Sequence, residues 1–179
     1  MSVETQPFLR SAALLERALR VIFGVVLLSG GVVAVWMIVD TPALGQMLAG
    51  NIGYGMAELR DWQSHGLAAL VLVQIGIWAA VVWQGRQIFA ALGTPDLVAA
   101  TRAARIAARL LWIMLIWGVL AHALGSVVAT WHFPDGQRAL AISVGSAEIS
   151  TIIAALLATF TAHAFVLGAA LWQDHREVI

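Results

Sequence analysis

The chain has 179 residues, of which 61% are hydrophobic and only 11% are charged. Soluble domains average about 45–50% apolar and about 25% charged residues, so this composition excludes an ordinary soluble domain and predicts a surface covered by lipid. The formal net charge of +0 argues against direct binding of nucleic acid, and the absence of cysteine excludes disulfides, thiolate metal sites and thiol catalysis.

Four apolar segments reach the roughly 20 residues that a helix needs to cross a hydrocarbon core of about 30 Å. They cover residues 21–39, 66–83, 110–130 and 149–172, and none contains Asp, Glu, Lys or Arg. The first follows three arginines, but it is too long for the apolar part of a signal peptide. We therefore expect an all-α fold, a polytopic integral membrane four-helix bundle that forms a single transmembrane domain over residues 1–179.

Two connecting segments are expected to be helical and continuous with the spans. Residues 5–7 (Thr-Gln-Pro) provide a helix cap and an early helical proline, and residues 7–20 carry a helical apolar repeat. Gly93 can end one helix, and residues 94–96 (Thr-Pro-Asp) can start the next. These signals predict helical extensions over about 7–20 and about 95–109.

The other two connections are expected to be rich in turns. Residues 40–42 (Asp-Thr-Pro) can stop the first helix and cap a new one. Four glycines follow before residue 56, which predicts a turn-rich segment on the membrane surface. Residues 133–136 (Phe-Pro-Asp-Gly) also predict a turn.

Arginines determine the expected orientation, because short cytoplasmic loops carry an excess of basic residues. Eight of the ten arginines lie in the N-terminal segment, in the connection 84–105, at the entrance to the third span or in the tail. The connections 40–65 and 131–148 hold one each. We expect both termini and residues 84–105 in the cytoplasm (N-in/C-in), with the other two connections outside.

The middle connection and the tail carry a family resemblance. Residues 87–89 (Gln-Ile-Phe), 93–96 (Gly-Thr-Pro-Asp) and the arginine-bearing run 102–109 resemble the cytoplasmic hairpin of a bacterial four-span family, the domain of unknown function 2975. The tail at residues 165–179 is also similar, whereas Asp96 stands where the family usually has phenylalanine. The resemblance implies a multi-pass protein of the bacterial cytoplasmic (inner) membrane, often encoded beside a helix-turn-helix regulator, and it carries over no catalytic residue.

Polar side chains inside spans are the default functional candidates, and here they are Gln74, His122 and His163. The two histidines differ in depth by roughly 9 Å at 1.5 Å per residue, whereas the axial ligands of one haem lie at nearly equal depth. We therefore expect no cofactor, and interpret both histidines as hydrogen-bonded to a neighbouring helix. A haem- or proton-handling subunit using His122 and His163 stays an alternative, although the spans lack a carboxylate.

Metal binding and catalysis are not supported by motif spacing. Asp61, His65, His132 and Asp135 of the outer connections could meet, but no H-x₃₋₅-H or H-E-x-x-H pattern is present. Signatures of serine hydrolases and phosphate-binding loops are also missing. We expect no metal site and no enzyme.

Small residues recur every four positions in the third and fourth spans, as Ala121, Gly125 and Ala129 and as Ala154, Ala158 and Ala162. Such rows let helix backbones approach closely in a membrane, where hydrophobicity cannot drive association. We favour packing inside the bundle over mating with another protein.

Arg102, Arg105 and Arg109 fall within about 60° of one another on a helix of 3.6 residues per turn. They can contact lipid headgroups of the bilayer, or dock an acidic surface of a cytoplasmic or membrane protein partner. The function we expect is a non-enzymatic inner-membrane accessory or regulatory protein that acts through protein contacts. A small-solute transporter is a second alternative, disfavoured because the spans lack charged residues.

Overall fold

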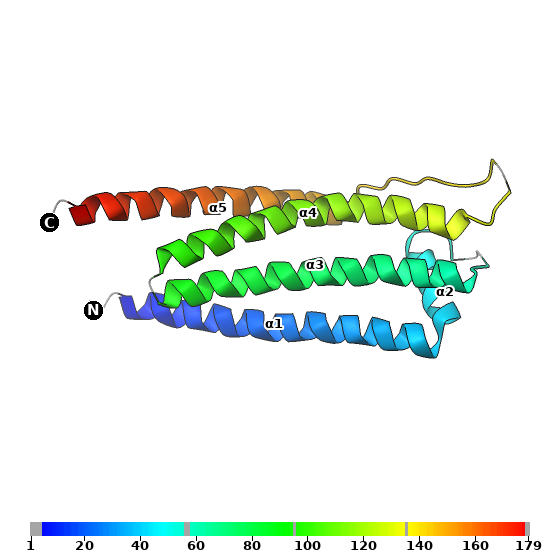
Figure 1. The fold of residues 1–179 in the computed structure, drawn as a ribbon, viewed down its shortest axis with the longest axis horizontal. Coiled ribbons are helices and arrows are strands. Elements are labelled where there is room, and N and C mark those ends of the chain that lie inside the picture. Colours follow the sequence, from blue (N-terminus) through cyan, green and yellow to red (C-terminus); the bar gives the residue numbers. More distant parts are fainter. Residues whose placement is uncertain (1–4, 56–57, 95, 135, 178–179) are drawn as a thin grey trace. The chain divides into compact units, whose positions relative to one another are not determined.

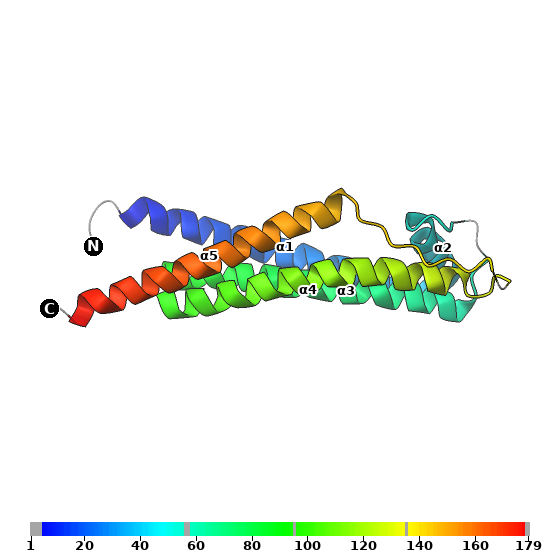
Figure 2. The same cartoon turned by 90° about the horizontal axis from the view of Figure 1, so that it is seen from above.

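The computed structural model describes the chain apart from residues 1–4, 56–57, 95, 135 and 178–179. Over the described residues it forms five helices, shown in Figures 1 and 2. They are α1 (Thr5–Val39), α2 (Thr41–Asn51), α3 (Asp61–Gly93), α4 (Leu97–Thr130) and α5 (Ser146–Glu177). The predicted all-α fold is confirmed.

Four of these described helices are long and apolar enough to cross a membrane. Their candidate spans contain 30, 33, 34 and 23 residues and lie at Arg10–Val39, Asp61–Gly93, Leu97–Thr130 and Ser146–Gly168. Large apolar side chains cover their surfaces, including Ile38 at 81% and Phe160 at 75% exposure, which lipid accommodates and water does not. By the length and composition of its helices, the chain is a multi-pass membrane protein, as predicted.

The helices start where the sequence supplies caps. Asp96 precedes α4, and its Oδ1 accepts a hydrogen bond from the backbone N–H of Ala99 at 2.9 Å. Pro95, expected in the first turn, lies outside the described residues. α1 is continuous from Thr5 to Val39, so residues 7–20 and the first apolar segment form one helix.

The prediction of a turn-rich segment directly after the first span was wrong in part, because the 11 residues of α2 (Thr41–Asn51) are helical. The capping expectation holds. Asp40 accepts a hydrogen bond from the N–H of Ala43 at 3.1 Å, and Pro42 lies in the first turn. The turn follows only after α2, where Gly53 adopts a φ of 89° that favours glycine.

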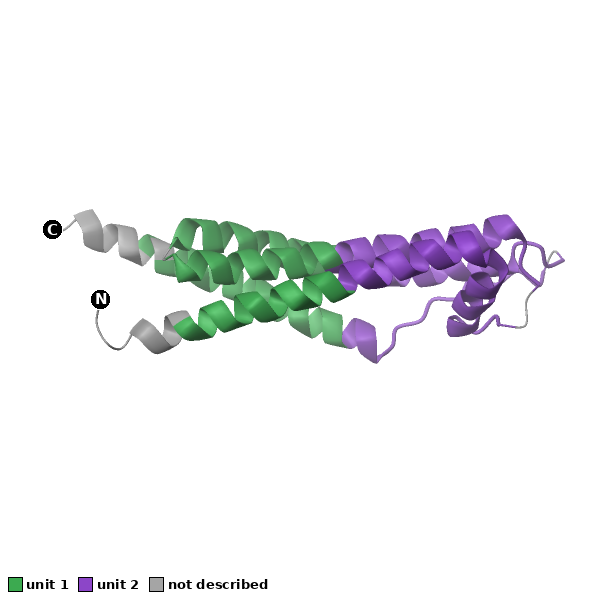
Figure 3. Ribbon diagram, turned by 90° about the horizontal axis from the view of Figure 1, so that it is seen from below, with its two compact units in different colours: residues 1–25, 79–113, 150–179 green, residues 26–78, 114–149 purple. Residues whose placement is uncertain are grey.

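The chain divides into two compact units, coloured separately in Figure 3. Unit 2 contains residues 26–78 and 114–149, and its core forms where α2 packs against α3. Gly45 lies so close to Ser64 that an added Cβ would be 2.6 Å from the Ser64 Cβ. This packing explains why a glycine-containing segment is helical. The buried apolar residues of the core are Leu44, Leu48, Ala49, Leu67 and Ala68.

Two buried hydroxyl groups of α4 hold the loop that leads to α5. The N–H of Ala141 donates to Ser126 Oγ at 2.9 Å, and the N–H of Ala139 donates to Thr130 Oγ1 at 3.0 Å. The predicted row of small residues on α4 packs internally in unit 2. An added Cβ at Gly125 would lie 3.2 Å from Ile52 Cδ1.

Unit 1 contains residues 1–25, 79–113 and 150–179, and so includes parts of α1, α3, α4 and α5. The rings of Phe23 and Trp83 pack with centroids 5.5 Å apart and join α1 to α3. On α5 the buried alanines among the described residues are Ala155 and Ala162. Of the predicted row of Ala154, Ala158 and Ala162, only Ala162 is therefore buried. The buried alanines of α4 in this unit are Ala100, Ala103, Ala104, Ala107 and Ala108.

Candidate functional site

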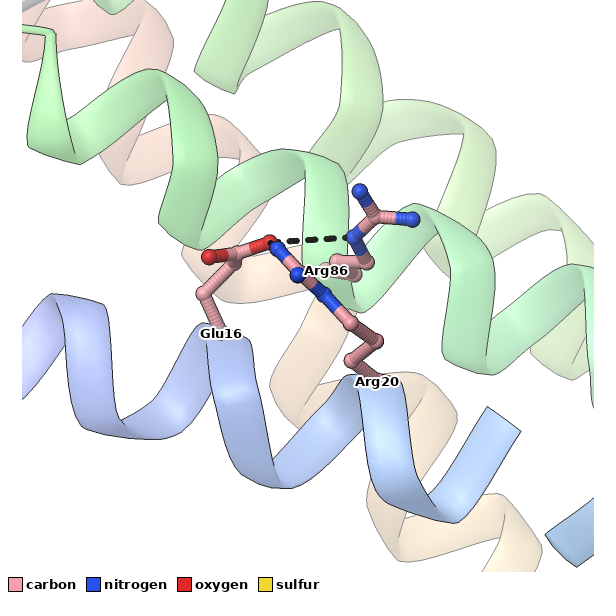
Figure 4. Close-up of polar contacts among 3 residues, drawn as sticks. All are labelled: Glu16, Arg20 and Arg86. Carbon is pink, nitrogen blue, oxygen red and sulfur yellow. Dashed lines mark hydrogen bonds and ion pairs between the residues drawn. The ribbon is translucent and has the colours of Figure 1, made fainter. Parts of the chain in front are cut away.

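The carboxylate of Glu16 joins α1 to α3 in unit 1. It pairs with Arg86, one of the arginines on which the predicted orientation rests. Glu16 Oε1 lies 2.8 Å from an Arg20 guanidinium nitrogen and 3.0 Å from Arg86 Nε (Figure 4). The Arg86 guanidinium also lies 4.8 Å from the ring centroid of Trp83. Arg86 thus acts inside unit 1 as a helix-to-helix contact, and is not left free for another ligand.

The three arginines of α4 differ from Arg86 in their surroundings. This segment of α4 is rich in alanine, the strongest helix former. Its buried alanines form the side of the helix that packs inside the protein. Arg102, Arg105 and Arg109 are all exposed. Within the part of the chain that the structure describes, none of them forms an ion pair. Their charges are therefore available to a molecule other than the described chain.

The structure separates these three arginines into two hollows of unit 1, although they share one helix. Arg102 lines a hollow of about 430 Å³ between α3 and α4. Arg105 and Arg109 line a second hollow of about 530 Å³ between α4 and α5. The three arginines of the expected stripe thus line two different hollows.

Half of the ten residues that line the hollow at Arg102 are polar. Gln84 and Gln87 contribute amides from α3, and Thr94 lies in the connection to α4. Thr94 Oγ1 lies 3.2 Å from the carbonyl oxygen of Ala91, to which it donates. Arg102 thus supplies the positive charge of a hollow whose other polar groups are amides, a hydroxyl and the helix-capping carboxylate of Asp96.

The hollow between α4 and α5 contains His163, which the sequence singled out. His163 Nδ1 lies 2.9 Å from the carbonyl oxygen of Thr159, so this nitrogen donates within α5 itself. Trp112 Nε1 donates to Thr159 Oγ1 at 3.3 Å and connects α4 to α5. The expectation that His163 bonds to a neighbouring helix is wrong for Nδ1, because this nitrogen donates to the preceding turn of α5.

Gln74 and His122 come together in unit 2, at a cavity of about 210 Å³. Gln74 comes from α3 and His122 from α4, and Asn51 at the end of α2 adds a third polar side chain. Among the described residues His122 has no hydrogen-bond partner, which also corrects the expectation of a bond to a neighbouring helix. Asn51 was missed because its segment was expected to be a turn. The remaining lining residues are Leu48, Ile52, Leu67, Leu70, Val71, Gly118, Ala121 and Gly125.

His65 and His132, the histidines of the two connections expected outside, each lie within hydrogen-bond distance of another group of the chain. His65 Nδ1 lies 2.7 Å from the carbonyl oxygen of Asp61 in its own helix, and His132 Nδ1 lies 3.1 Å from Gln63 Nε2. Asp135 lies outside the described residues. Across the described part of the chain, no group of three or more His, Asp or Glu side chains could hold a metal ion.

Gln63 is a buried polar residue that the sequence did not reveal. Its Nε2 donates to the carbonyl oxygen of Val128 at 2.6 Å and lies near His132, and its Oε1 accepts from the N–H of Arg60 at 2.8 Å. The last contact resembles half of a capping box, with the third helical residue reaching back to the helix start. Gln63 therefore fixes the start of α3 to the end of α4 in unit 2.

No family model, curated protein or solved structure matches the chain. The resemblance to the four-span family stays a prediction.

Proposed function

We propose that this chain is an accessory or regulatory protein of the bacterial cytoplasmic membrane that acts without catalysis, by docking an acidic segment of a partner protein. The observation that carries the proposal is the exposed Arg102 side chain, which lines the α3–α4 hollow and forms no ion pair with the described residues. A carboxylate from a partner would pair with this guanidinium, and the neighbouring amides would complete the contact.

The proposed orientation places both termini and the α3–α4 connection in the cytoplasm. Unit 1 contains the described start of α1, the end of α3, the start of α4 and the end of α5 (Figures 1 and 3). Four membrane crossings require the start of the first span, the connection between the second and third spans and the end of the fourth span to lie on one side. The excess of arginines in these segments supports the cytoplasmic side.

Position along α4 separates a protein contact from a lipid contact. Arg102 precedes Arg109 by seven residues, which is about 10 Å along a helix axis. Lipid attraction declines within a Debye length of about 8 Å at physiological salt. Headgroups would therefore act mainly on Arg109, whereas a cytoplasmic partner would reach Arg102 first.

We expect Arg102→Gln to weaken partner binding about fivefold, since a solvent-exposed ion pair contributes up to about 1 kcal/mol. The test places a photo-crosslinking amino acid at Ala99, an exposed residue of the same hollow, and measures the yield of a defined covalent adduct in cells. Adduct yield should decline in Arg102→Gln and further at high salt.

Arg17→Gln is the matched control, because Arg17 is an exposed arginine of α1 outside this hollow. It should leave the adduct unchanged, as should Arg109→Gln, with membrane insertion verified for every variant. Docking at the α3–α4 hollow is refuted if correctly inserted Arg102→Gln protein crosslinks as well as the wild type.

A further inference from the structure

Among the described residues that line it, the α4–α5 hollow of unit 1 has two arginines and no carboxylate. Arg105 and Arg109 are one helical turn apart and both line it, with His163 opposite on α5. No Asp or Glu is among the lining residues, which otherwise are Ala108, Trp112, Thr159, Ala162 and Val166. An anion can therefore pair with two guanidinium groups here, whereas a zwitterion would bring a cation that has no counter-charge.

The same hollow borders surface that suits a hydrocarbon chain. Ala108, Ala162 and Val166 give it an apolar floor. On the same helix, Phe160 is exposed at 75% and Leu167 at 66%. Both belong to the candidate span Ser146–Gly168, so this surface faces lipid if α5 crosses the membrane. A ligand with a charged head and an apolar tail matches both parts.

The exposure of His163 also points to a polar ligand. A polar ring that meets only lipid tails loses its hydration, which is costly inside a span. His163 is exposed, and its one hydrogen bond to a described group uses Nδ1. A headgroup in the hollow would place polar atoms and water beside this ring.

We propose that the α4–α5 hollow is a binding site for an anionic phospholipid. Arg105 and Arg109 pair with the phosphate, because guanidinium groups match phosphate oxygens in geometry and charge. Trp112 and His163 form the walls beside the headgroup, and an acyl chain follows the exposed apolar surface of α5. The site does not include Arg102, so it stands independently of the proposed docking function.

The test is native mass spectrometry of the purified full chain with equimolar phosphatidylglycerol and phosphatidylcholine. The wild type should retain one phosphatidylglycerol in preference. Each cation near a headgroup contributes about fivefold, so the double variant Arg105→Gln/Arg109→Gln should lower this preference roughly 25-fold. Arg105→Lys/Arg109→Lys keeps the charge but loses the fork geometry, so it should retain part of the preference.

Arg10→Gln/Arg17→Gln is the matched control, since it removes two exposed arginines of unit 1 that lie outside the hollow. It should bind phosphatidylglycerol like the wild type. An unchanged preference in the Arg105→Gln/Arg109→Gln protein, or an equal loss in the control, would overturn the proposal. Equal occupancy by inorganic phosphate at the same concentration as the lipid would also overturn it, because the acyl chain would then add nothing to binding. Circular dichroism of each variant verifies that its helices are formed.

Discussion

Gly45→Ala is expected to destabilise the packing of α2 on α3 by about 1–3 kcal/mol, the range seen when a tight core is overfilled. The added Cβ would lie 2.0 Å from Ser64 Oγ, 2.6 Å from Ser64 Cβ and 3.1 Å from Ser64 Cα. A new rotamer of Ser64 can move Oγ but cannot move its Cβ or Cα, so the two helices have to separate. The free energy of unfolding in detergent, measured by thermal or denaturant melting, reports this loss.

Gly76→Ala is the matched control on α3. Gly76 is exposed, and an added Cβ would meet no atom within 4 Å. Alanine favours a helix over glycine by about 1 kcal/mol, so this variant should be as stable as the wild type or more stable. Equal stability of the Gly45→Ala and Gly76→Ala proteins would show that α2 does not pack closely on α3.

Gln63→Leu is expected to cost about 2–3 kcal/mol in unit 2. The leucine would remove the acceptor of the Arg60 N–H and would leave His132 without its partner, while the Val128 carbonyl would keep only the long 3.4 Å bond from the Trp131 N–H. Buried polar groups left unpaired cost about 1–3 kcal/mol each when water cannot replace the lost partner. Thermal melting should report the loss, and limited proteolysis should show faster cleavage in the loop after α4.

Gln46→Leu provides the comparison for this variant, because Gln46 is an exposed glutamine of α2 in the same unit. Its replacement should change the free energy of unfolding by less than about 0.5 kcal/mol, as is usual for surface positions. If both leucine variants melt at the wild-type temperature, the buried amide does not hold α3 to α4.

The long helices could be predicted because lipid imposes a strong rule on composition. A span needs roughly 20 apolar residues and no charge, and the four segments satisfy this rule visibly. α2 could not be predicted in the same way. It is short and contains glycine at positions 45 and 50, so local propensity disfavours it. Its stability comes from Leu44 and Leu48 against α3, contacts that join residues distant in the sequence.

The candidate sites were predictable in their residues and not in their arrangement. Helical spacing correctly grouped Arg102, Arg105 and Arg109 on one helix, but their division between two hollows depends on where α3 and α5 pack. Gln74 and His122 were identified separately, since no sequence pattern indicates that α3 and α4 bring them to one cavity.

The absence of cysteine permits a direct test of the proposed orientation. Single cysteines would be introduced at Thr94, which lines the hollow of Arg102, and at Gln137 in the loop after α4, both at exposed positions. Cells with an intact cytoplasmic membrane would then be treated with a membrane-impermeant maleimide. We expect Thr94→Cys to react only after the membrane is permeabilised and Gln137→Cys to react at once. Immediate reaction of Thr94→Cys would place the arginine-bearing connection outside and contradict the proposed orientation, and with it docking to a cytoplasmic partner.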